Sequence, residues 1–417
     1  MFTGGKGQRY VLVMVGLPAR GKTYTARKLA GYLSWLGYPT RVFNVGAHRR
    51  EKLGAQQPAE FFDPFNVAAE RLRHEVATAT LEEALAWLRG DARVAIFDAT
   101  NSSRERRAEI RRRCADSGLG VVFIEIVNDE EHVIEANVRE TKLSSPDYVH
   151  MEPEAAVADF RARIAHYEQV YETLEEDEGS FLKIIDRGRR VVMNEIDGYL
   201  PARIVFFLTN LQVTSRPLWI TRHGESIYNV KGLIGGDSAL SPGGRQYAER
   251  LARHVEETFG REAPLEVWTS TLVRTIQTAE PLKRDVSHWR SLDEIDAGIC
   301  DGMSYEEIAR LMPHEWEGRR RDKLRYRYPR GESYEDVIQR VDRVIIEAER
   351  QRTPVLIIGH QAVLRALYSY FQGLPVDRTP YVSIPLHSVV ELTPKAYGCE
   401  ERRIDLGPSA VTASSST

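Results

Sequence analysis

The sequence has little of what extracellular and membrane proteins usually contain. Cysteine occurs only three times in 417 residues, as Cys114, Cys300 and Cys399. So few cysteines, in an odd number, argue against a disulfide framework and fit a reducing compartment. No apolar run approaches the ~20 residues that a membrane-spanning helix needs, and the first residues lack the apolar stretch of a signal peptide. We therefore expect a cytoplasmic protein without a membrane partner.

An excess of charge of one sign is also lacking. The formal net charge is −3, from 57 basic and 60 acidic residues, and aromatic residues make up 9% of the chain. Proteins that bind nucleic acids usually gather lysine and arginine on one surface, and many add aromatic side chains that stack on bases. The composition therefore predicts no nucleic acid partner.

What the sequence does have is length and the composition of a globular protein. The chain is too long for one core, so two domains of about 200 residues each are expected. Apolar segments at 10–15, 40–45, 93–100 and 120–127 are typical of strands, and helical patterns such as the one at 66–89 alternate with them. This alternation predicts a mainly parallel sheet with helices on both faces.

The second half of the chain repeats this alternation without repeating the sequence. The segment TNLQVTSRPLWI marks the junction, because a strand–loop–strand sequence there begins a new α/β pattern. We predict a first domain over residues 1–214 and a second over residues 215–407. Residues 408–417 are small and polar, which is typical of a disordered tail.

The segment GLPARGKT at 16–23 satisfies the pattern G-x-x-x-x-G-K-[ST]. It follows an expected strand and opens an expected helix, the context in which this pattern binds nucleotide phosphates. The glycines let backbone N–H groups wrap the phosphates, Lys22 reaches the β- and γ-phosphates, and the Thr23 hydroxyl coordinates Mg²⁺. The alternative, a chance glycine-rich turn, is disfavoured by the flanking elements. The segment predicts that ATP and Mg²⁺ bind here.

Asp98 ends the strand expected at 93–100, where nucleotide sites hold an acidic residue near the metal. The same residue could instead cap the helix that follows. Because Asn101 or Ser102 could fill that capping role, we favour a role for Asp98 at the metal or at the acceptor hydroxyl.

Arginines gather after the expected strands of the first half, and guanidinium groups match phosphate oxygens in pairs. They are Arg49, Arg50, Arg73, Arg104, Arg106 and Arg107. Several arginines of the run RERRAEIRRRC must simply face solvent. Residue types alone therefore predict a kinase that acts on an anionic small molecule.

Two histidines follow apolar strands in the second half, at the strand ends where α/β active sites gather. His223 lies in the sequence RHGE, and His360 in LIIGHQAVLRA. A neutral imidazole can attack phosphorus while cations hold the phosphoryl oxygens. Either histidine alone would more often be structural. Together they predict His223 as a nucleophile, clamped by Arg222, Arg274 and His360.

Cleavage of a phosphate ester also requires a proton for the leaving alkoxide, which a carboxylic acid can supply. Glu294, in the segment LDEIDAG, is the candidate. Asp293 and Asp296 are close in sequence, and chemistry alone does not exclude them.

Several segments occur in the order that is typical of one family. They are GLPARGKTY, FNVGAHRRE, FDATNSSRERR, SSPDY, RHGESIYN, IGGDSALS, WTSTLVRTIQTAE, LDEIDAGICDGMSYEEI, RYRYPRGESYEDV and GHQAVLRAL. Over nearly all of residues 10–400 the chain resembles the bifunctional 6-phosphofructo-2-kinase/fructose-2,6-bisphosphatase family.

The resemblance implies a P-loop NTPase-like kinase domain followed by a histidine phosphatase α/β domain like that of phosphoglycerate mutase. It implies transfer of the γ-phosphoryl group of ATP to the 2-hydroxyl of fructose 6-phosphate, and hydrolysis of fructose 2,6-bisphosphate through a phosphohistidine. The level of a glycolytic regulator would be set in this way. It also implies a homodimer formed through the kinase half.

The resemblance further assigns site residues by position. ATP contacts fall on Gly16, Leu17, Pro18, Ala19, Arg20, Gly21, Lys22, Thr23, Tyr24, Asn137 and Lys142. The fructose 6-phosphate site falls on Arg49, Arg73, Thr100, Arg106, Lys142, Arg163 and Tyr167. Fructose 2,6-bisphosphate contacts fall on Arg222, Asn229, Gly235, Tyr305, Arg319, Lys323, Tyr334, Gln361 and Arg365. The catalytic residues would be Lys22, Asp98, His223, Glu294, His360, Arg222 and Arg274, with Thr23 and Asp98 at the metal.

The chain departs from the family pattern at Asn128, where members usually carry a cysteine after FIEIV. The missing thiol predicts a different kinase rate or redox sensitivity. Because few residues flank the two expected domains, we also expect little room for switching by phosphorylation.

Two other classes of protein compete with this interpretation. An end-healing kinase–phosphatase for nucleic acids also joins a P-loop to a phosphatase, but it would need a basic, aromatic groove. A sensor that binds sugar phosphate without turnover would need no nucleophile–acid pair. The retained catalytic residues favour a working bifunctional enzyme.

Overall fold

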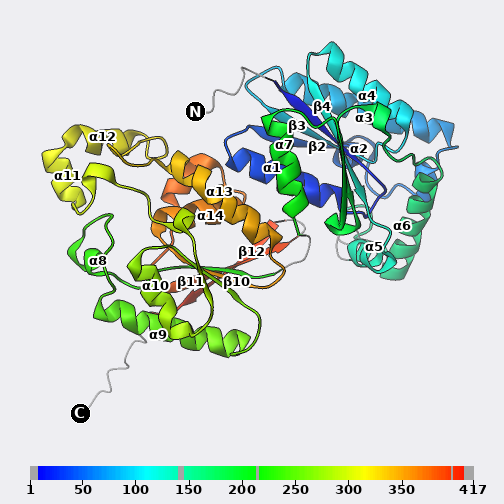
Figure 1. Ribbon diagram of the computed structural model, residues 1–417. Coiled ribbons are helices and arrows are strands. Elements are labelled where there is room, and N and C mark those ends of the chain that lie inside the picture. The colour runs from blue at the N-terminus through cyan, green and yellow to red at the C-terminus, as the bar shows by residue number, and fades with distance from the viewer. Residues whose placement is uncertain (1–7, 140–144, 213–215, 396–397, 408–417) are drawn as a thin grey trace. The chain divides into compact units, whose positions relative to one another are not determined.

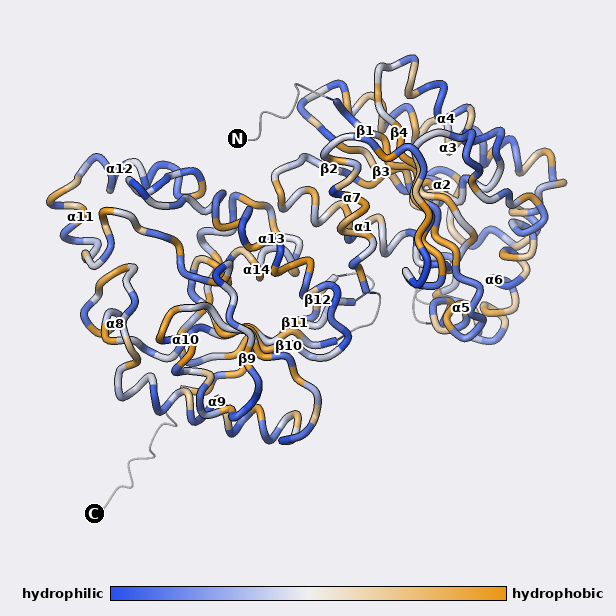
Figure 2. Tube along the Cα trace, viewed as in Figure 1, coloured by the Kyte–Doolittle hydropathy of each residue, from blue (hydrophilic) through white to orange (hydrophobic). Residues whose placement is uncertain are grey.

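The computed structural model describes residues 8–139, 145–212, 216–395 and 398–407. The chain divides into two compact units between Leu211 and Gln212. Each unit is built around its own six-stranded sheet (Figure 1). Hydrophobic residues concentrate in the central strands of both sheets (Figure 2), so each unit has its own core. The tail expected at 408–417 lies outside the described residues.

In the first unit, strands β1 to β5 are parallel and β6 pairs antiparallel to β5, in the order β2-β3-β1-β4-β5-β6. The strands are β1 (Tyr10–Val15), β2 (Thr40–Asn44), β3 (Val94–Asp98), β4 (Gly120–Val127), β5 (Phe181–Ile185) and β6 (Arg190–Asn194). The helices are α1 (Lys22–Trp35), α2 (Val45–Leu53), α3 (Val67–Trp87), α4 (Arg104–Asp116), α5 (Glu131–Asn137), α6 (Pro153–Glu168) and α7 (Tyr199–Asn210). The first four strands and α3 lie where the sequence predicts them.

Strand β1 shows why this half folds as a parallel sheet. All six of its residues are buried, as expected of a strand that helices cover on both faces. Val11, Val13 and Val15 belong to a core cluster that includes residues of α3 and α4. On α1, Tyr32 stacks on Phe207 of α7 with ring centroids 4.1 Å apart. The apolar run of β1 therefore places the loop after it firmly at one edge of the sheet.

The second unit has the strand order β12-β11-β7-β10-β8-β9. Strands β7 to β10 are parallel, β11 pairs antiparallel to β7, and β12 pairs antiparallel to β11. The strands are β7 (Leu218–Arg222), β8 (Glu266–Thr269), β9 (Val286–His288), β10 (Val355–Gly359), β11 (Ser388–Lys395) and β12 (Gly398–Asp405). The helices are α8 (Ile227–Lys231), α9 (Pro242–Phe259), α10 (Val273–Ala279), α11 (Tyr305–Leu311), α12 (Pro313–Arg321), α13 (Tyr334–Arg350) and α14 (Gln361–Phe371).

Two glycines allow α9 to pack against the turn after β7. A side chain at Gly224 would collide with the backbone of Gly244, and one at Gly244 would collide with the backbone of Glu225. Ser241 caps α9 by accepting a hydrogen bond from the N–H of Gly244 at 3.1 Å. The start of α9 therefore supports the backbone beside His223.

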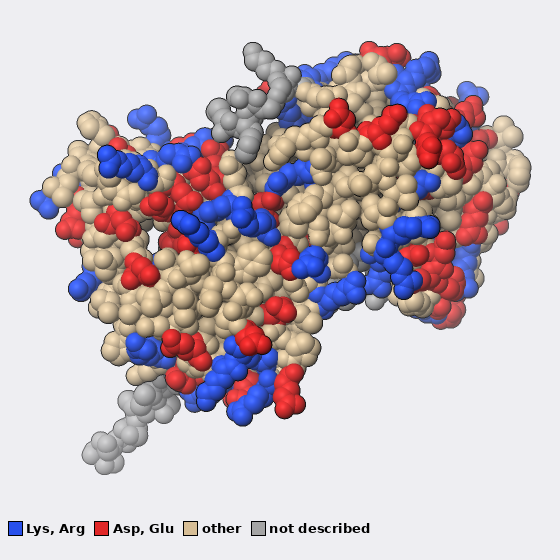
Figure 3. Space-filling model, viewed as in Figure 1, with Lys and Arg blue, Asp and Glu red and all other residues tan. Residues whose placement is uncertain are grey.

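The surface carries both signs of charge. On the face shown in Figure 3, lysine and arginine alternate with aspartate and glutamate. None of the described helices is long and apolar enough to cross a membrane.

Candidate active sites

The first candidate site surrounds the loop of residues 16–23, between β1 and α1. Gly16 and Gly21 have φ values of 133° and 97°, which strongly favour glycine. A side chain at Gly16 would also meet the carbonyl oxygen of Ile126 on β4, at 2.6 Å. Helix α1 begins at Lys22 with no side-chain cap and no acidic residue in its first turn. Such a helix N-terminus suits an anion.

Two side chains brace this loop. Lys22 donates from Nζ to the carbonyl oxygen of Leu17 at 2.6 Å, so the amine folds over the loop. Asn137, at the end of α5, donates to the carbonyl oxygen of Ala19 at 2.9 Å. These contacts bring the predicted ATP residues of α5 and of the loop together. Lys142 lies outside the described residues.

The other predicted ATP residues lie in or next to this loop. Pro18 and Arg20 are loop residues, and Thr23 and Tyr24 belong to the first turn of α1. The side chain of Arg20 is buried, and its Nη2 lies 3.6 Å from a carboxylate oxygen of Glu168. Burial lowers the pKa of this guanidinium.

Asp98 is buried at the end of β3, the strand next to β1. Its Oδ2 accepts a hydrogen bond of 2.5 Å from Nδ2 of Asn44, at the end of β2. The sequence suggested Asp98, Asn101 or Ser102 as the cap of α4, but the cap is Ser103. Its hydroxyl oxygen accepts a hydrogen bond of 3.4 Å from the N–H of Arg106. Asp98 is therefore left at the sheet edge that also carries the loop of residues 16–23.

Tyr167, on α6, is the centre of the predicted sugar phosphate residues. Burial raises the pKa of its phenol, and the charges of Arg73, Arg49 and Arg163 and a hydrogen bond to Thr100 oppose this rise. The interactions show that these side chains, from four segments far apart in the sequence, meet at one place. The predicted Arg106 also interacts with Tyr167; it is half-buried, and this burial lowers its pKa.

Asp147 holds part of this cluster; it lies in the segment SSPDY, but no role was assigned to it from the sequence. Its oxygens lie 2.8 and 2.7 Å from Nη2 of Arg49, 3.4 Å from Arg50 and 3.9 Å from Arg163. Burial alone would raise the pKa of this carboxyl, but the hydrogen bonds and charge of Arg49 hold it below its usual value. Nη1 of Arg49 is buried and has no acceptor among the described residues. One donor of the cluster thus stays available to an anion.

Two other residues considered in the sequence analysis, Arg107 and Asn128, are buried and bond to the protein itself. Arg107 is fully buried and bonds Glu178 in a bidentate pair, with both distances 2.7 Å. Asn128 is buried after β4, where its Oδ1 accepts a hydrogen bond of 3.1 Å from the N–H of Glu130. The amide thus shapes the turn that leads into α5.

The second candidate site lies where β7 and β10 end side by side. Gly359 pairs with Arg222 across the two strands, and the N–H of His223 donates to Gly359 at 3.0 Å. Nδ1 of His223 lies 2.7 Å from the carbonyl oxygen of Gly224, which can only accept a hydrogen bond. Nδ1 therefore carries the proton, and Nε2 of a neutral His223 presents a lone pair.

Arg274, on α10, joins the two histidines. Its Nε lies 3.2 Å from Nε2 of His223 and 3.2 Å from Nδ1 of His360. Burial, followed by the charge of Arg274, lowers the pKa of each histidine well below its usual value. Both imidazoles are therefore neutral near pH 7. Nη1 of Arg274 donates to the carbonyl oxygen of Gly236 at 2.6 Å, which orients the guanidinium.

Arg222 completes this group of cations. Its Nε is buried and has no acceptor among the described residues, and its pKa is lowered by burial. Burial also lowers the pKa of Arg274. The charge of Glu294 opposes this effect on both arginines, but no carboxylate among the described residues forms an ion pair with either guanidinium. An anion such as a phosphoryl group would therefore stabilise the pair.

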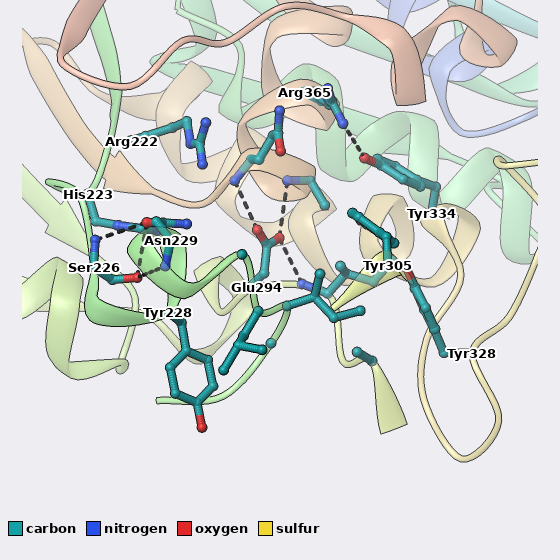
Figure 4. A pocket seen from close by; sticks show the side chains of 18 of the residues that line it. Arg222, His223, Ser226, Tyr228, Asn229, Glu294, Tyr305, Tyr328, Tyr334 and Arg365 are labelled. Carbon is teal, nitrogen blue, oxygen red and sulfur yellow. Dashed lines mark hydrogen bonds between the residues drawn. The ribbon is translucent and has the colours of Figure 1, made fainter. Parts of the chain in front are cut away.

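These residues open onto a cavity of about 350 Å³ (Figure 4). The predicted residues that line it are Arg222, His223, Asn229, Gly235, Arg274, Glu294, Tyr305, Arg319, Lys323, Tyr334, Gln361 and Arg365. His360 is not among the lining residues; it is fully buried and reaches the cavity through Arg274. Tyr228, Tyr326 and Tyr328 also line the cavity; they lie in the segments RHGESIYN and RYRYPRGESYEDV, but no contact was assigned to them from the sequence.

Of the three neighbouring acidic residues, Glu294 alone lines the cavity. Its oxygens accept hydrogen bonds of 3.1 Å from the N–H groups of Gln361 and Ala362, at the start of α14. Figure 4 shows this carboxylate between the two sides of the cavity. Asp293 instead accepts from Thr271, and Asp296 from the following loop.

A second set of cations lines the cavity through different elements. Arg319 donates to the hydroxyls of Tyr328 and Tyr305 at 2.9 and 3.0 Å. Arg365 donates to the hydroxyl of Tyr334 at 3.0 Å (Figure 4). Burial, then the charges of Arg365 and Arg319, lower the pKa of Lys323 to about 8. These two sets of cations suit a ligand with two phosphates.

Asn229 is held in place by its own helix. Its Oδ1 accepts from the N–H and the hydroxyl of Ser226, both at 3.0 Å, in a capping box at the start of α8. The neighbouring Gly235 has φ 71°, and a side chain there would collide with Asp301. Asn229 is therefore positioned by its helix cap, and Gly235 by its close approach to Asp301.

Comparisons with known proteins find a family match for each half of the chain. The model of the 6-phosphofructo-2-kinase family matches residues 1–215, and that of the histidine phosphatase superfamily (branch 1) matches residues 218–406. Among solved structures, the chain is similar to Bacillus stearothermophilus YhfR, with 31% identity over 42% of this chain and 90% of that one and a TM-score of 0.38.

Two relatives carry the name 6-phosphofructo-2-kinase/fructose-2,6-bisphosphatase. The protein from Arabidopsis thaliana is 50% identical over 97% of this chain, which spans 55% of that relative's length. The protein from Gallus gallus is 48% identical over 96% of this chain and 86% of its own length. The chain therefore belongs to the 6-phosphofructo-2-kinase/fructose-2,6-bisphosphatase family, with a kinase domain followed by a histidine phosphatase domain.

Proposed function

We propose that the chain synthesises fructose 2,6-bisphosphate from fructose 6-phosphate and ATP in residues 1–214, and hydrolyses it to fructose 6-phosphate and phosphate in residues 215–407. The observation that carries the proposal is the cavity of about 350 Å³ in the second unit. At one end His223 and Arg274 form a site for phosphoryl transfer, and Lys323 with other cations lines the rest. A bisphosphate can thus be gripped by one phosphate while the other is cleaved.

In the kinase half, the glycine-rich loop holds the phosphates of ATP, and Lys22 swings from Leu17 to the transferred phosphoryl group. The cluster around Tyr167 holds the 6-phosphate of the sugar. Asp98 orients the 2-hydroxyl or accepts its proton. Thr100 and Arg106 both interact with Tyr167 and belong to the same sugar phosphate site.

Mg²⁺ fits the donors of this site, because Thr23 and Asp98 offer oxygen and Mg²⁺ prefers oxygen ligands and few protein groups. When bound, the ion neutralises charge on the β- and γ-phosphates. Thr23, in the first turn of α1, and Asp98, at the end of β3, would hold it.

In the phosphatase half, Nε2 of His223 attacks the phosphorus of the 2-phosphate, and the bond from phosphorus to the sugar oxygen breaks. Arg222, Arg274 and His360 hold the phosphoryl oxygens. Glu294 supplies the proton that the leaving alkoxide takes up. Water then hydrolyses the phosphohistidine and releases phosphate.

The same proposal covers assembly and location. β6 is the last strand of the first sheet, and Val192 and Met193 on it are 39% and 57% exposed. Pairing with β6 of a second copy would cover them and extend the sheet, giving a homodimer through the kinase domain. A cytoplasmic location is supported by the scarcity of cysteine, since the three cysteines form no disulfide among the described residues, as in a reducing compartment.

Two assays on one purified sample test the function. One follows ATP-dependent formation of fructose 2,6-bisphosphate; the other follows its hydrolysis and traps acid-labile ³²P on the protein. Turnover in both directions is the expected result. Hydrolysis without synthesis would remove the kinase half of the proposal, and synthesis without hydrolysis or trapped label would remove the phosphatase half.

A further inference from the structure

Two hydroxyl groups lie behind the histidine site and are not among the site residues that the sequence predicted. Ser270 follows β8, and Thr275 lies in the first turn of α10, inside the segment WTSTLVRTIQTAE. Both are fully buried, as is His360. Oγ of Ser270 lies 2.7 Å from Nε2 of His360 and 2.8 Å from Oγ1 of Thr275. The hydroxyls therefore form a chain that ends on the imidazole.

The partners of His360 fix where its proton lies. Nε of Arg274 carries one hydrogen, which is shared between Nε2 of His223 and Nδ1 of His360, each 3.2 Å away, so Nδ1 of His360 is an acceptor. A neutral imidazole has one N–H, which then lies on Nε2 and donates to Ser270.

The partners of Ser270 fix the rest of the chain. Its oxygen accepts from Nε2 of His360 and from the N–H of Leu272 at 3.1 Å, which uses both lone pairs. The hydroxyl hydrogen of Ser270 must then go to Thr275. Thr275 in turn donates to the carbonyl oxygen of Leu272 at 2.9 Å or to that of Ser270 at 3.3 Å. The hydrogens on Nε2 of His360 and on the hydroxyl of Ser270 thus each have one possible position.

In the empty site the lone pair on Nδ1 of His360 shares the N–H of Arg274 with His223. A phosphoryl group that draws this N–H to its own oxygens would leave the lone pair facing another acceptor. The oxygens of a phosphoryl group are acceptors too, and two acceptors that face each other repel. We infer that Ser270 and Thr275 are positioning residues that hold the Nε2 proton of His360, so that the site binds a phosphoryl group only together with one further proton on Nδ1. This inference rests on the proposed phosphatase function and adds to it.

The proton balance of the binding step is simple. Neutral His360 takes one proton from solvent and becomes an imidazolium that donates from Nε2 to Ser270 and from Nδ1 to a phosphoryl oxygen. The proton stays on His360 while the phosphoryl group moves to Nε2 of His223. It returns to solvent when phosphate leaves.

The charged groups around His360 explain why the proton arrives only with the anion. The pKa of His360 in the empty site is lowered first by burial and then by the charges of its neighbours. These are Arg274 on α10, His223 and Arg222 at the end of β7, and Arg340 on α13. Glu294 faces the two amides that follow His360. A phosphoryl dianion would offset the cations and so favour the imidazolium.

Calorimetry measures this proton directly. Binding of inorganic phosphate to the full-length protein near pH 7, repeated in buffers of different ionisation enthalpy, gives the number of protons taken up. We expect the wild-type protein to take up about one proton more than His360→Gln, whose amide does not titrate. Equal uptake by these two proteins would overturn the inference. The probe is phosphate itself, so the result holds even if the protein hydrolyses another ester.

Variants of the hydroxyls then test their role. Ser270→Ala leaves Nε2 without an acceptor, so proton uptake should fall and the alkaline limb of kcat against pH should move to lower pH. Turnover should fall about 10- to 100-fold, as expected when a hydrogen bond to a charged group is lost. Thr275→Val should shift the same limb by less, and Thr275→Ser, which keeps the hydroxyl, should restore the wild-type profile.

A loss of structure is separated from this effect by thermal unfolding and by kinase turnover of the same samples. If Ser270→Ala does not fold, the Thr275→Val and Thr275→Ser pair decides the question. An unchanged pH profile and proton uptake in the folded valine variant would show that the hydroxyls only fill space. Absence of fructose 2,6-bisphosphate hydrolysis by the wild-type protein would instead refute the proposed function.

Discussion

Asn44, the last residue of β2, donates a hydrogen bond of 2.5 Å to Asp98, the last residue of β3. Oδ1 of Asn44 accepts from the N–H of Ala47 at 2.8 Å and caps α2. The amide nitrogen must therefore face Asp98. One side chain thus caps a helix and fixes the orientation of the carboxylate in the kinase site.

Asn44→Asp should lower the kinase rate at least about tenfold, because two carboxylates this close cannot both be ionised and one must bind a proton. Aspartate is also a good helix cap, so α2 should form as before. The rate of fructose 2,6-bisphosphate synthesis at saturating substrates measures the effect. Hydrolysis of the same compound by the same sample is the control. Undiminished synthesis would show that the orientation of Asp98 does not depend on Asn44.

The two halves should fail separately. His223→Ala removes the nucleophile and should reduce hydrolysis at least about 10³-fold while synthesis continues. Lys22→Met keeps the length of the side chain but removes its charge, and should abolish synthesis while hydrolysis continues. Each variant is the matched control of the other in the paired assays. Loss of both activities in either one would mean that the two sites depend on each other.

The sequence predicted the parts of each site that a strand or a glycine-rich turn places by itself. The segment GLPARGKT after a buried strand specifies a phosphate loop, and histidines at 223 and 360 follow two strands that turn out to be neighbours. In such cases the local pattern predicts where the site residues lie, because parallel strands have their carboxyl ends at the same edge of the sheet.

Contacts between distant segments could not be predicted in this way. Asp147 bonds Arg49 across 98 positions, and Ser270 bonds His360 across 90. Aspartate and serine are common surface residues, so neither had a pattern that indicated burial. The helix cap was misplaced for a related reason: Asn101 is drawn into the core, where its amide donates to the carbonyl oxygen of Met14 at 2.7 Å. Tertiary packing, rather than propensity, decided these positions.

Hydrolysis should weaken as the pH rises past 8. Lys323 has a pKa of about 8 because it is buried beside Arg365 and Arg319. Its amine is charged below this pH and neutral above it. If only the charged form binds the 6-phosphate, kcat/KM should fall about tenfold between pH 7 and pH 9, with most of the change in KM. Initial rates over this range measure it.

Lys323→Arg is the control for this titration, because a guanidinium stays charged throughout. The arginine variant should lose the dependence of KM on pH above 8, whatever its absolute rate. Lys323→Gln should show at pH 7 the high KM that the wild type reaches at pH 9. A wild-type KM that is constant up to pH 9 would contradict the role of Lys323 in binding.

Glu294 should matter in proportion to the basicity of the leaving group. Its carboxyl group lies in the cavity against the N–H groups of Gln361 and Ala362, where its protonated form can give a proton to the sugar alkoxide. Glu294→Gln fills the same space without an acidic proton. Hydrolysis of fructose 2,6-bisphosphate should fall about 10²- to 10⁴-fold. An aryl phosphate with a good leaving group, such as p-nitrophenyl phosphate, needs no proton and should be cleaved at a nearly unchanged rate.

Asp293→Asn separates this role from a general effect of charge. Asp293 is adjacent in sequence, but its oxygens bond Thr271 and do not line the cavity, so both substrates should be cleaved at similar fractions of the wild-type rate. Equal losses on both substrates in Glu294→Gln would mean that the carboxylate mainly holds the start of α14. Dependence on the leaving group in Asp293→Asn instead would move the acid to that residue. The comparison therefore assigns the proton donor among the three neighbouring carboxylates by chemistry rather than by position.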